Sequence, residues 1–111
     1  MSSANGRYVY VWEFEVDPRF TAQFLEAYGP SGTWAALFGK APGYIGTLLL
    51  QDQANAVRYL TIDRWSSHQA YEAFRTHFGA EYAELDRICE AFTSRESSLG
   101  SYWECCAPNI A

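Results

Sequence analysis

The chain has 111 residues, of which 49% are hydrophobic, 17% aromatic and 19% charged, and its formal net charge is −5. This length fits one domain, residues 1–111 with an ordered core over about 7–104, which can bury roughly two thirds of the surface exposed by the unfolded chain. The acidic balance and the single lysine, Lys40, argue against nucleic acid or an anionic membrane as a partner.

The N-terminal sequence and the cysteines bear on location and redox state. MSSANGRYVYVWEFEV contains neither a basic leader followed by an apolar run nor an apolar span of membrane length, so we expect a cytoplasmic protein. The cysteines Cys89, Cys105 and Cys106 are odd in number and form no CxxC pair. We therefore expect reduced thiols, with neither a structural disulfide nor a metal site.

The first half of the chain predicts one strand and two helical pieces. Residues 7–16, RYVYVWEFEV, carry large apolar groups at every even position, which is typical of a strand. Asp17 and Pro18 predict the start of a helix, because Asp caps helices well and Pro is favoured at the first helical position. GPSG at 29–32 interrupts this helix, and a second piece extends to Gly39.

The second half predicts a hairpin, a long helix and a last strand. Residues 44–51 and 57–65 are two expected strands joined by a polar connection. Ser66 is expected to cap a helix that pauses at Gly79 and then resumes. A more polar strand is expected over roughly 94–105.

This order of elements predicts an α+β, ferredoxin-like βαββαβ fold, with one four-stranded antiparallel sheet and helices on one face. The expected strands are apolar on both sides, as Leu48 and Leu50 against Leu49 illustrate. An uncovered sheet face of this kind exposes a large apolar patch. We therefore expect a homodimer formed through the open face of the sheet.

Three stretches carry a resemblance to a known family: RYVYVWEFEV, APGYIGTLLLQD and VRYLTIDRWSSHQAYEAFRTHF. Over residues 7 to about 104 the chain resembles the antibiotic biosynthesis monooxygenase family. The resemblance implies dimerisation sheet to sheet as a dimeric α+β barrel. Members that oxidise phenolic polyketides without a cofactor pair a strand-end Trp with a helical Tyr, here Trp65 and Tyr71. The partner Asn of those oxygenases corresponds to Thr61.

A haem-degrading branch of the same fold implies a second chemistry. It uses a first-strand Asn, a strand-end Trp and a helical His as the axial ligand, and Trp65 and His77 match this pattern loosely. The first strand has Tyr8, Tyr10 and Trp12 where the Asn would be needed. The chain also lacks a phosphate loop and the Rossmann glycines. We therefore expect no cofactor.

The junction between the third strand and the following helix holds the candidate catalytic residues His68, Tyr71 and Trp65. Helical spacing places His68 beside Tyr71 in the first turn, where the helix dipole favours a neutral imidazole that can accept a proton. We expect His68 to be the base, Tyr71 to donate a hydrogen bond to a ring oxygen, and Trp65 to stack on the substrate. The alternative is an exposed histidine beside a core tryptophan.

Candidate substrate-binding residues come from the strand and from the helices. Strand alternation places Thr61 and Asp63 on the same side as Trp65. In a cleft there, Asp63 would ionise a substrate hydroxyl or orient a histidine, and the alternative is an ion pair with an arginine. The helices contribute Tyr28, Trp34, Phe38 and His77, for which core packing or solvent exposure is the alternative.

Two functions agree best with these observations, and a haem-binding or haem-degrading relative is a further, less favoured alternative. The first is a cofactor-independent, monooxygenase-like protein that oxidises a small aromatic, phenolic or quinol substrate with O2. The second is a non-catalytic small-molecule-binding or stress-related dimer of the same fold.

Overall fold

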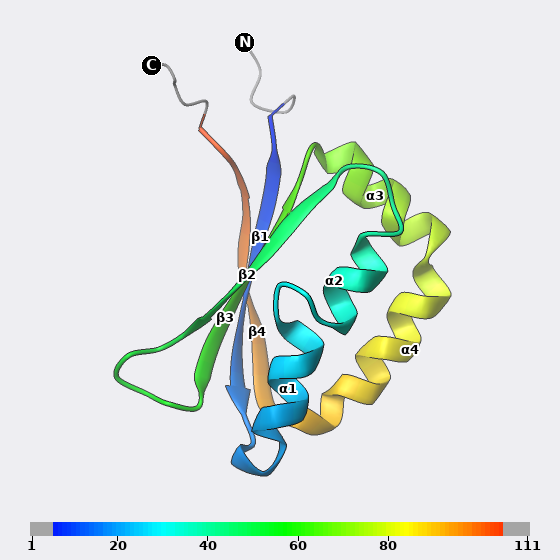
Figure 1. The fold of residues 1–111 in the computed structure, drawn as a ribbon. Coiled ribbons are helices and arrows are strands. Elements are labelled where there is room, and N and C mark those ends of the chain that lie inside the picture. Colours follow the sequence, from blue (N-terminus) through cyan, green and yellow to red (C-terminus); the bar gives the residue numbers. More distant parts are fainter. Residues whose placement is uncertain (1–5, 106–111) are drawn as a thin grey trace.

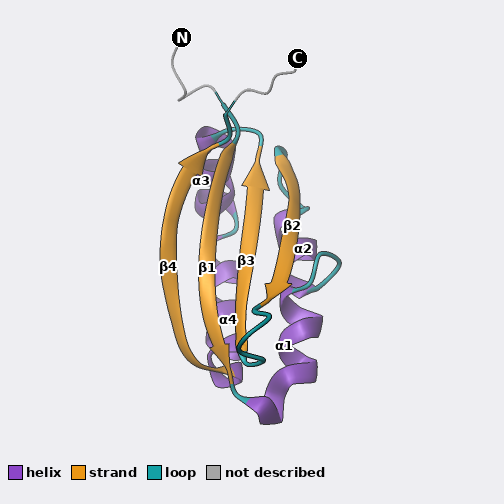
Figure 2. Ribbon diagram, turned by 90° about the vertical axis from the view of Figure 1, so that its left-hand side faces the viewer, coloured by secondary structure: helices purple, strands orange, loops and turns teal. Residues whose placement is uncertain are grey.

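The computed structural model describes residues 6–105, which form one sheet with helices packed on a single face (Figures 1 and 2). The strands are β1 (Tyr8–Val16), β2 (Tyr44–Gln51), β3 (Arg58–Trp65) and β4 (Thr93–Trp103). All neighbouring strands are antiparallel, and their order in the sheet is β2-β3-β1-β4. The predicted ferredoxin-like α+β fold is confirmed.

Over residues 6–105, four α-helices and two 3-10 turns make up the second layer. They are η2 (Pro18–Phe20), α1 (Thr21–Tyr28), α2 (Thr33–Phe38), α3 (His68–His77), α4 (Gly79–Cys89) and η3 (Glu90–Phe92). Within the described range, no helix has the length and apolar character that crossing a membrane requires.

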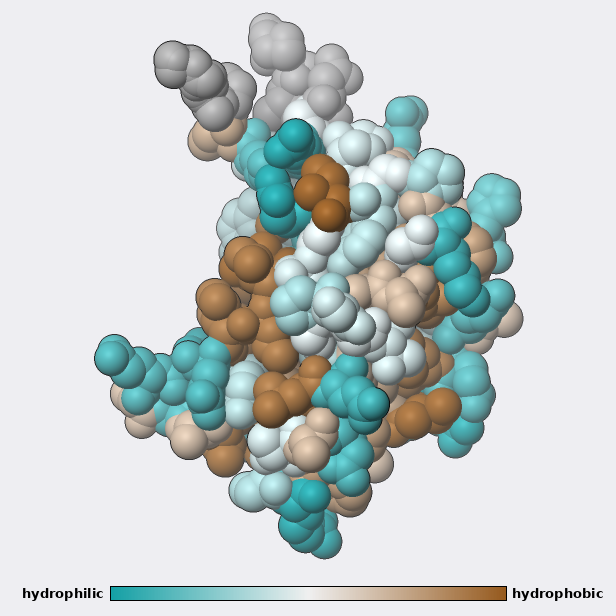
Figure 3. Space-filling model, in the orientation of Figure 1, coloured by the Kyte–Doolittle hydropathy of each residue, from teal (hydrophilic) through white to brown (hydrophobic). Residues whose placement is uncertain are grey.

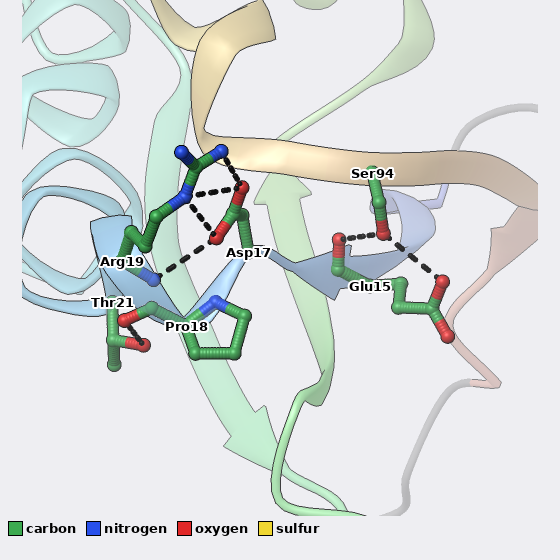
Figure 4. Close-up of polar contacts among 6 residues, drawn as sticks. All are labelled: Glu15, Asp17, Pro18, Arg19, Thr21 and Ser94. Atoms are coloured by element: carbon green, nitrogen blue, oxygen red, sulfur yellow. Dashed lines mark hydrogen bonds and ion pairs between the residues drawn. The ribbon is translucent and has the colours of Figure 1, made fainter.

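Polar contacts fix the point where β1 gives way to the helical layer (Figure 4). The carboxylate of Asp17 accepts a hydrogen bond from the Arg19 backbone N–H at 3.0 Å and pairs with the Arg19 guanidinium at 2.7 Å. Asp17 thus caps η2, and Pro18 occupies its first turn, as the sequence predicts. Ser94 of β4 donates to the Glu15 carbonyl at 3.2 Å, which ties the end of β1 to β4.

The cap of α3 lies one residue later than predicted. The Ser67 side chain, rather than that of Ser66, accepts the hydrogen bond from the Ala70 backbone N–H, at 3.0 Å. Ser66 is held by its own N–H, which donates to the Gly43 carbonyl at 2.7 Å. This bond to the turn before β2 extends the strand-like chain past Trp65 and delays the helix by one residue.

The core lies between the sheet and the helices. Inward-facing residues of β3 are buried at every second position, and Trp65 and Phe24 are fully inaccessible to solvent. Phe74 of α3 is 1% exposed and packs on Trp65, with 5.3 Å between ring centroids. The predicted alternation of β3 is confirmed, and the side chains at the sheet-helix boundary have fixed positions.

No described residue covers the opposite face of the sheet. Leucines of β2 and β4 are exposed there, with Leu48 at 51%, Leu50 at 44% and Leu99 at 39%. Figure 3 shows hydrophobic surface gathered on the left-hand side, where Figure 1 shows the sheet. An apolar patch on this face is typical of a contact surface.

Two cysteines lie in the described range. Cys89 is buried at the end of α4, Cys105 is exposed, and both are free thiols. Cys106, the third cysteine of the sequence, lies outside the described residues.

Candidate active site

A cavity of about 150 Å³ lies between the sheet and helices α1, α2 and α4. Most of its wall is aromatic: Tyr10, Trp12, Phe14, Tyr28, Trp34, Phe38 and Tyr82. The polar part of the lining is Thr47, Thr61, Asp63, Asp86 and Glu96. Of the residues that the structure describes, no Lys, Arg or His contributes to it. Aromatic walls with a few polar groups are typical of a site for a small organic molecule.

The aromatic wall is built by strand alternation and by ring packing. Tyr10, Trp12 and Phe14 are alternate residues of β1, so all three point to the helical side of the sheet. The ring of Phe14 packs on that of Tyr28 at 4.8 Å, and Tyr28 lies 6.0 Å from Trp34, measured between centroids. These contacts fix the rings, so the cavity is preformed.

Asp63 occupies the inner end of the cavity. Asp63 is 7% exposed, and its Oδ1 accepts a hydrogen bond from Thr47 Oγ1 at 2.5 Å. The Tyr44 hydroxyl lies 2.5 Å from the same Thr47 oxygen. Since the single Thr47 proton is directed at Asp63, Tyr44 donates to Thr47. The result is a chain of hydrogen bonds from half-buried Tyr44 to the carboxylate.

No cation pairs with Asp63 within the described part of the chain. The neighbouring arginines on β3 point to the other face, where Arg58 pairs with Glu13 and Arg64 pairs with Glu104. The expected ion pair between Asp63 and an arginine of β3 is therefore absent, because successive residues of a strand face opposite sides of the sheet.

Burial sets the protonation behaviour of the cavity. It raises the pKa of Asp63 to about 6, against a smaller opposing effect of the Thr47 hydrogen bond. It also raises the pKa of Tyr82 to about 12 and that of Tyr10 well above its ordinary value. The tyrosines therefore stay neutral near pH 7, whereas Asp63 can exchange a proton there.

The other two carboxyl groups lie nearer to solvent. Tyr82 and Asp86 are four residues apart on α4 and both face the cavity. Glu96 of β4 pairs in register with Phe14 and is exposed. Burial, followed by the nearby Asp86, raises the pKa of Glu96, which indicates that these two acids lie close to each other. The cavity thus has a buried acid at one end and two acids at its mouth.

Comparison with known proteins identifies the family. A family model described as antibiotic biosynthesis monooxygenase matches residues 7–85. The chain belongs to the antibiotic biosynthesis monooxygenase family. No curated protein gives a significant match to this family member.

Solved structures show the same fold as this family member. SnoaB from Streptomyces nogalater, a cofactor-independent oxygenase, is 19% identical, with a TM-score of 0.68 over 94% of this chain and 98% of SnoaB. A Bordetella bronchiseptica protein proposed to be an antibiotic biosynthesis monooxygenase is 18% identical, with a TM-score of 0.71 over 91% of this chain and 99% of that one. At these identities the likeness concerns the fold.

Trp65 and Tyr71, two of the predicted catalytic residues, lie behind the cavity wall of this family member. Trp65 is fully buried, and its Nε1 donates to the Tyr10 hydroxyl at 3.3 Å. Tyr71 packs on Tyr10 with 4.9 Å between centroids, and its hydroxyl accepts from Arg75 at 3.0 Å. We expected both to line the cleft, but α3 packs directly on the end of β3 and closes this junction. Their direct contact is with Tyr10, which does line the cavity.

The two histidines also lie outside the cavity lining. The His68 ring packs on Tyr8 at 4.7 Å between centroids, and its Nε2 is 3.4 Å from a Glu72 carboxylate oxygen. His77 is exposed, with Nδ1 3.0 Å from the Ala73 carbonyl oxygen. Tyr8 is the first residue of β1, so His68 lies at the end of the sheet instead of under it. Neither histidine stands where the expected base or binding role places it.

The structure brings the other predicted binding residues together around the cavity. They are Tyr28, Trp34, Phe38, Thr61 and Asp63. The sequence interpretation did not assign a second group of lining residues: Tyr10, Trp12, Phe14, Thr47, Tyr82, Asp86 and Glu96. The even-numbered positions of β1 and the four-residue spacing of Tyr82 and Asp86 are the signals that could have found most of them.

Proposed function

We propose that this family member oxidises a one-ring phenol or quinol with O2, without a cofactor, and that Asp63 is the general base. The observation that carries the proposal is a buried carboxyl group with a pKa of about 6, unpaired with any described cation, inside an aromatic cavity. A base titrating near the working pH is well suited to proton abstraction. His68 is a weaker candidate because its imidazole lies outside the cavity lining.

The size of the cavity supports a one-ring substrate. Its volume is about 150 Å³. An apolar cavity of about this volume, engineered in another protein, binds benzene. A phenol with small ring substituents fits such a space, whereas a polycyclic substrate would require the helices to move.

The proposed reaction balances without a further reductant. Asp63 accepts the phenolic proton, and the phenolate passes one electron to O2. The resulting radicals join through a new C–O bond at a hydrogen-bearing ring carbon ortho or para to the hydroxyl. Cleavage of the O–O bond with loss of the ring hydrogen gives a quinone and water, so one oxygen atom enters each product. The protein supplies the base, the orientation and the exclusion of bulk water.

The hydrogen bonds behind Asp63 offer a route for the proton. Once the hydroxyls of Thr47 and Tyr44 turn so that each donates away from Asp63, protonated Asp63 can pass its proton to Thr47 and on toward the half-buried Tyr44, since the three groups lie within hydrogen-bond distance of one another. Trp65 and Tyr71 hold the ring and hydroxyl of Tyr10 in place. In this proposal they are positioning residues and do not contact the substrate.

Oxidation of syringol, an electron-rich one-ring phenol, tests the proposed function. With isotopically labelled O2, the purified protein is expected to form a dimethoxybenzoquinone that carries one labelled oxygen, as measured by mass spectrometry. The same reaction in labelled water with ordinary O2 should leave the quinone unlabelled. Absence of quinone above the protein-free rate, for syringol and for other one-ring phenols and quinols, would favour the non-catalytic binding protein.

We also propose a homodimer formed through the open sheet face. The exposed leucines of β2 and β4 support it, because burial of apolar side chains on this face removes them from water. A twofold contact between two copies of one face is the commonest arrangement of soluble oligomers.

Sedimentation equilibrium tests the dimer. At micromolar concentration the protein is expected at twice its chain mass of 12.6 kDa. Leu48→Glu should shift it toward the monomer, because it places a charge within the apolar face. Leu25→Glu is the matched control, since Leu25 of α1 is 42% exposed on the helical layer, and it should remain dimeric. A parent protein that sediments as a monomer would contradict the proposal.

A further inference from the structure

We infer that the cavity selects a phenol that carries a basic amine on a short tether, and that it discriminates against the corresponding carboxylate. This inference rests on the proposed function, because it assigns the substrate class of the same cavity. It depends on where the acidic residues lie relative to one another, on the lack of compensating cations in the lining, and on an unpartnered donor in the wall.

The acidic residues lie at opposite ends of the cavity. Asp63 of β3 is in register with Tyr10 of β1, whereas Glu96 of β4 is in register with Phe14. Four residues along β1 correspond to about 13 Å, and the strands on either side of β1 are about 10 Å apart. A ligand that contacts both ends therefore needs one polar group at each end and an apolar middle.

The mouth of the cavity favours positive charge. Asp86 and Glu96 form no ion pair with a described cation. The guanidinium of Arg75, on α3, lies 4.0 Å from the centroid of the Tyr82 ring and donates to Tyr71, but Arg75 is not part of the lining. An ammonium group at the mouth would interact with two carboxylates and with aromatic ring faces. A carboxylate there would be repelled by both acidic side chains of the lining.

The wall of the cavity also holds a hydrogen-bond donor that a ligand can engage. Trp34 is 7% exposed and lines the cavity, and its Nε1 has no hydrogen-bond partner in the described part of the protein. A buried N–H without an acceptor is costly, so a ligand oxygen that accepts from it would be favoured. This N–H lies close enough to the Tyr28 hydroxyl and the Cys89 thiol to oppose the rise in their pKa values, so it belongs to the wall between the two ends of the cavity.

Three probes of the same shape and different charge test the inference. Tyramine carries an ammonium group, tyrosol a hydroxyl group and para-hydroxyphenylacetate a carboxylate on the same phenol. Their dissociation constants are measured by isothermal titration calorimetry at pH 7.5 in the absence of O2, so that no turnover occurs. Tyramine is expected to bind at least tenfold more tightly than para-hydroxyphenylacetate, and tyrosol should lie between them.

A double variant that lacks the two carboxylates at the mouth separates the effect of local charge from that of the net charge of the protein. Asp86→Asn combined with Glu96→Gln keeps the shape of both side chains and should reduce the preference for tyramine to less than threefold. The matched control, Glu81→Gln combined with Glu26→Gln, makes the same change in net charge at two exposed positions outside the lining and should retain the preference. Circular dichroism spectra verify that both double variants are folded.

The outcomes distinguish this inference from the proposed function. Equal or tighter binding of para-hydroxyphenylacetate by the parent protein would overturn the charge preference and leave phenol oxidation standing. If the control pair loses the preference as fully as the cavity pair, the selectivity arises from net charge and the inference fails. If none of the three probes binds, the cavity does not accept one-ring phenols, and both the inference and the proposed function are overturned.

Discussion

Asp63→Asn is expected to slow phenol oxidation by at least about a hundredfold, the lower end of what a positioned general base contributes. Asparagine keeps the shape of the side chain and an oxygen that can accept the Thr47 hydrogen bond, which spans 2.5 Å in the parent protein. It cannot accept the substrate proton. The loss should therefore appear in kcat, while the affinity for tyrosol should change less than threefold.

The same substitution is expected to stabilise the fold near neutral pH. Burial raises the pKa of Asp63 from 3.8 to about 6, so the native state binds this proton more tightly than the unfolded state does. The parent protein therefore loses stability as the pH rises from about 4 to about 6, and the loss is complete above that range. A pKa shift of this size lowers the free energy of unfolding by about 3 kcal/mol at most. Asn does not ionise, so the variant does not incur this loss.

Thermal unfolding of both proteins between pH 4 and pH 8 checks this expectation. The melting temperature of Asp63→Asn should exceed that of the parent by several degrees near pH 7, and the two should converge toward pH 4. Burial also raises the pKa of Glu96, but this residue is present in both proteins, so its contribution cancels in the difference. An Asn variant that is less stable than the parent at pH 7 would show that the carboxylate is paired in solution, contrary to the structure.

Periodicity was sufficient to predict the elements and the sides on which residues lie. The alternation in β3 correctly placed Thr61 and Asp63 on the same side of the sheet as Trp65, and the structure shows that this is the side that the helices cover. It did so because the two-residue period of a strand is local and needs no knowledge of the partner elements. The cap of α3 was misplaced by one residue because the competing bond, from Ser66 to Gly43, joins segments far apart in the sequence.

The depth of a residue on the inward side depends on tertiary packing and could not be predicted in the same way. Asp63 and Trp65 are two residues apart with the same orientation, yet Asp63 lines the cavity and Trp65 lies in the solid core. The difference arises from α3 and Phe38, which pack on Trp65 and leave the space over Asp63 open. The hydrogen bond from Thr47 likewise depends on the pairing of β2 with β3, which a single strand does not specify.

The stability of Trp65→Ala tests whether Trp65 lies in the packed core or lines an open cleft. Trp65 is fully buried between Tyr44, Phe38 and Phe74, with ring centroids 5.3–5.7 Å away. Its removal leaves a large hole in the packed core and deprives the Tyr10 hydroxyl of its donor. We expect a loss of about 3–5 kcal/mol in the free energy of unfolding, measured in urea at a fixed protein concentration.

Trp103→Ala is the matched control for this loss. Trp103, at the end of β4, is 38% exposed, so the same substitution there should cost less than about 1 kcal/mol. Trp65→Phe should fall between the two, because it keeps most of the packing but removes the N–H that donates to Tyr10. If Trp65→Ala instead costs as little as Trp103→Ala, Trp65 faces an open cleft in solution. The strand-to-helix junction, with His68 and Tyr71, would then replace the cavity around Asp63 as the best candidate for the active site.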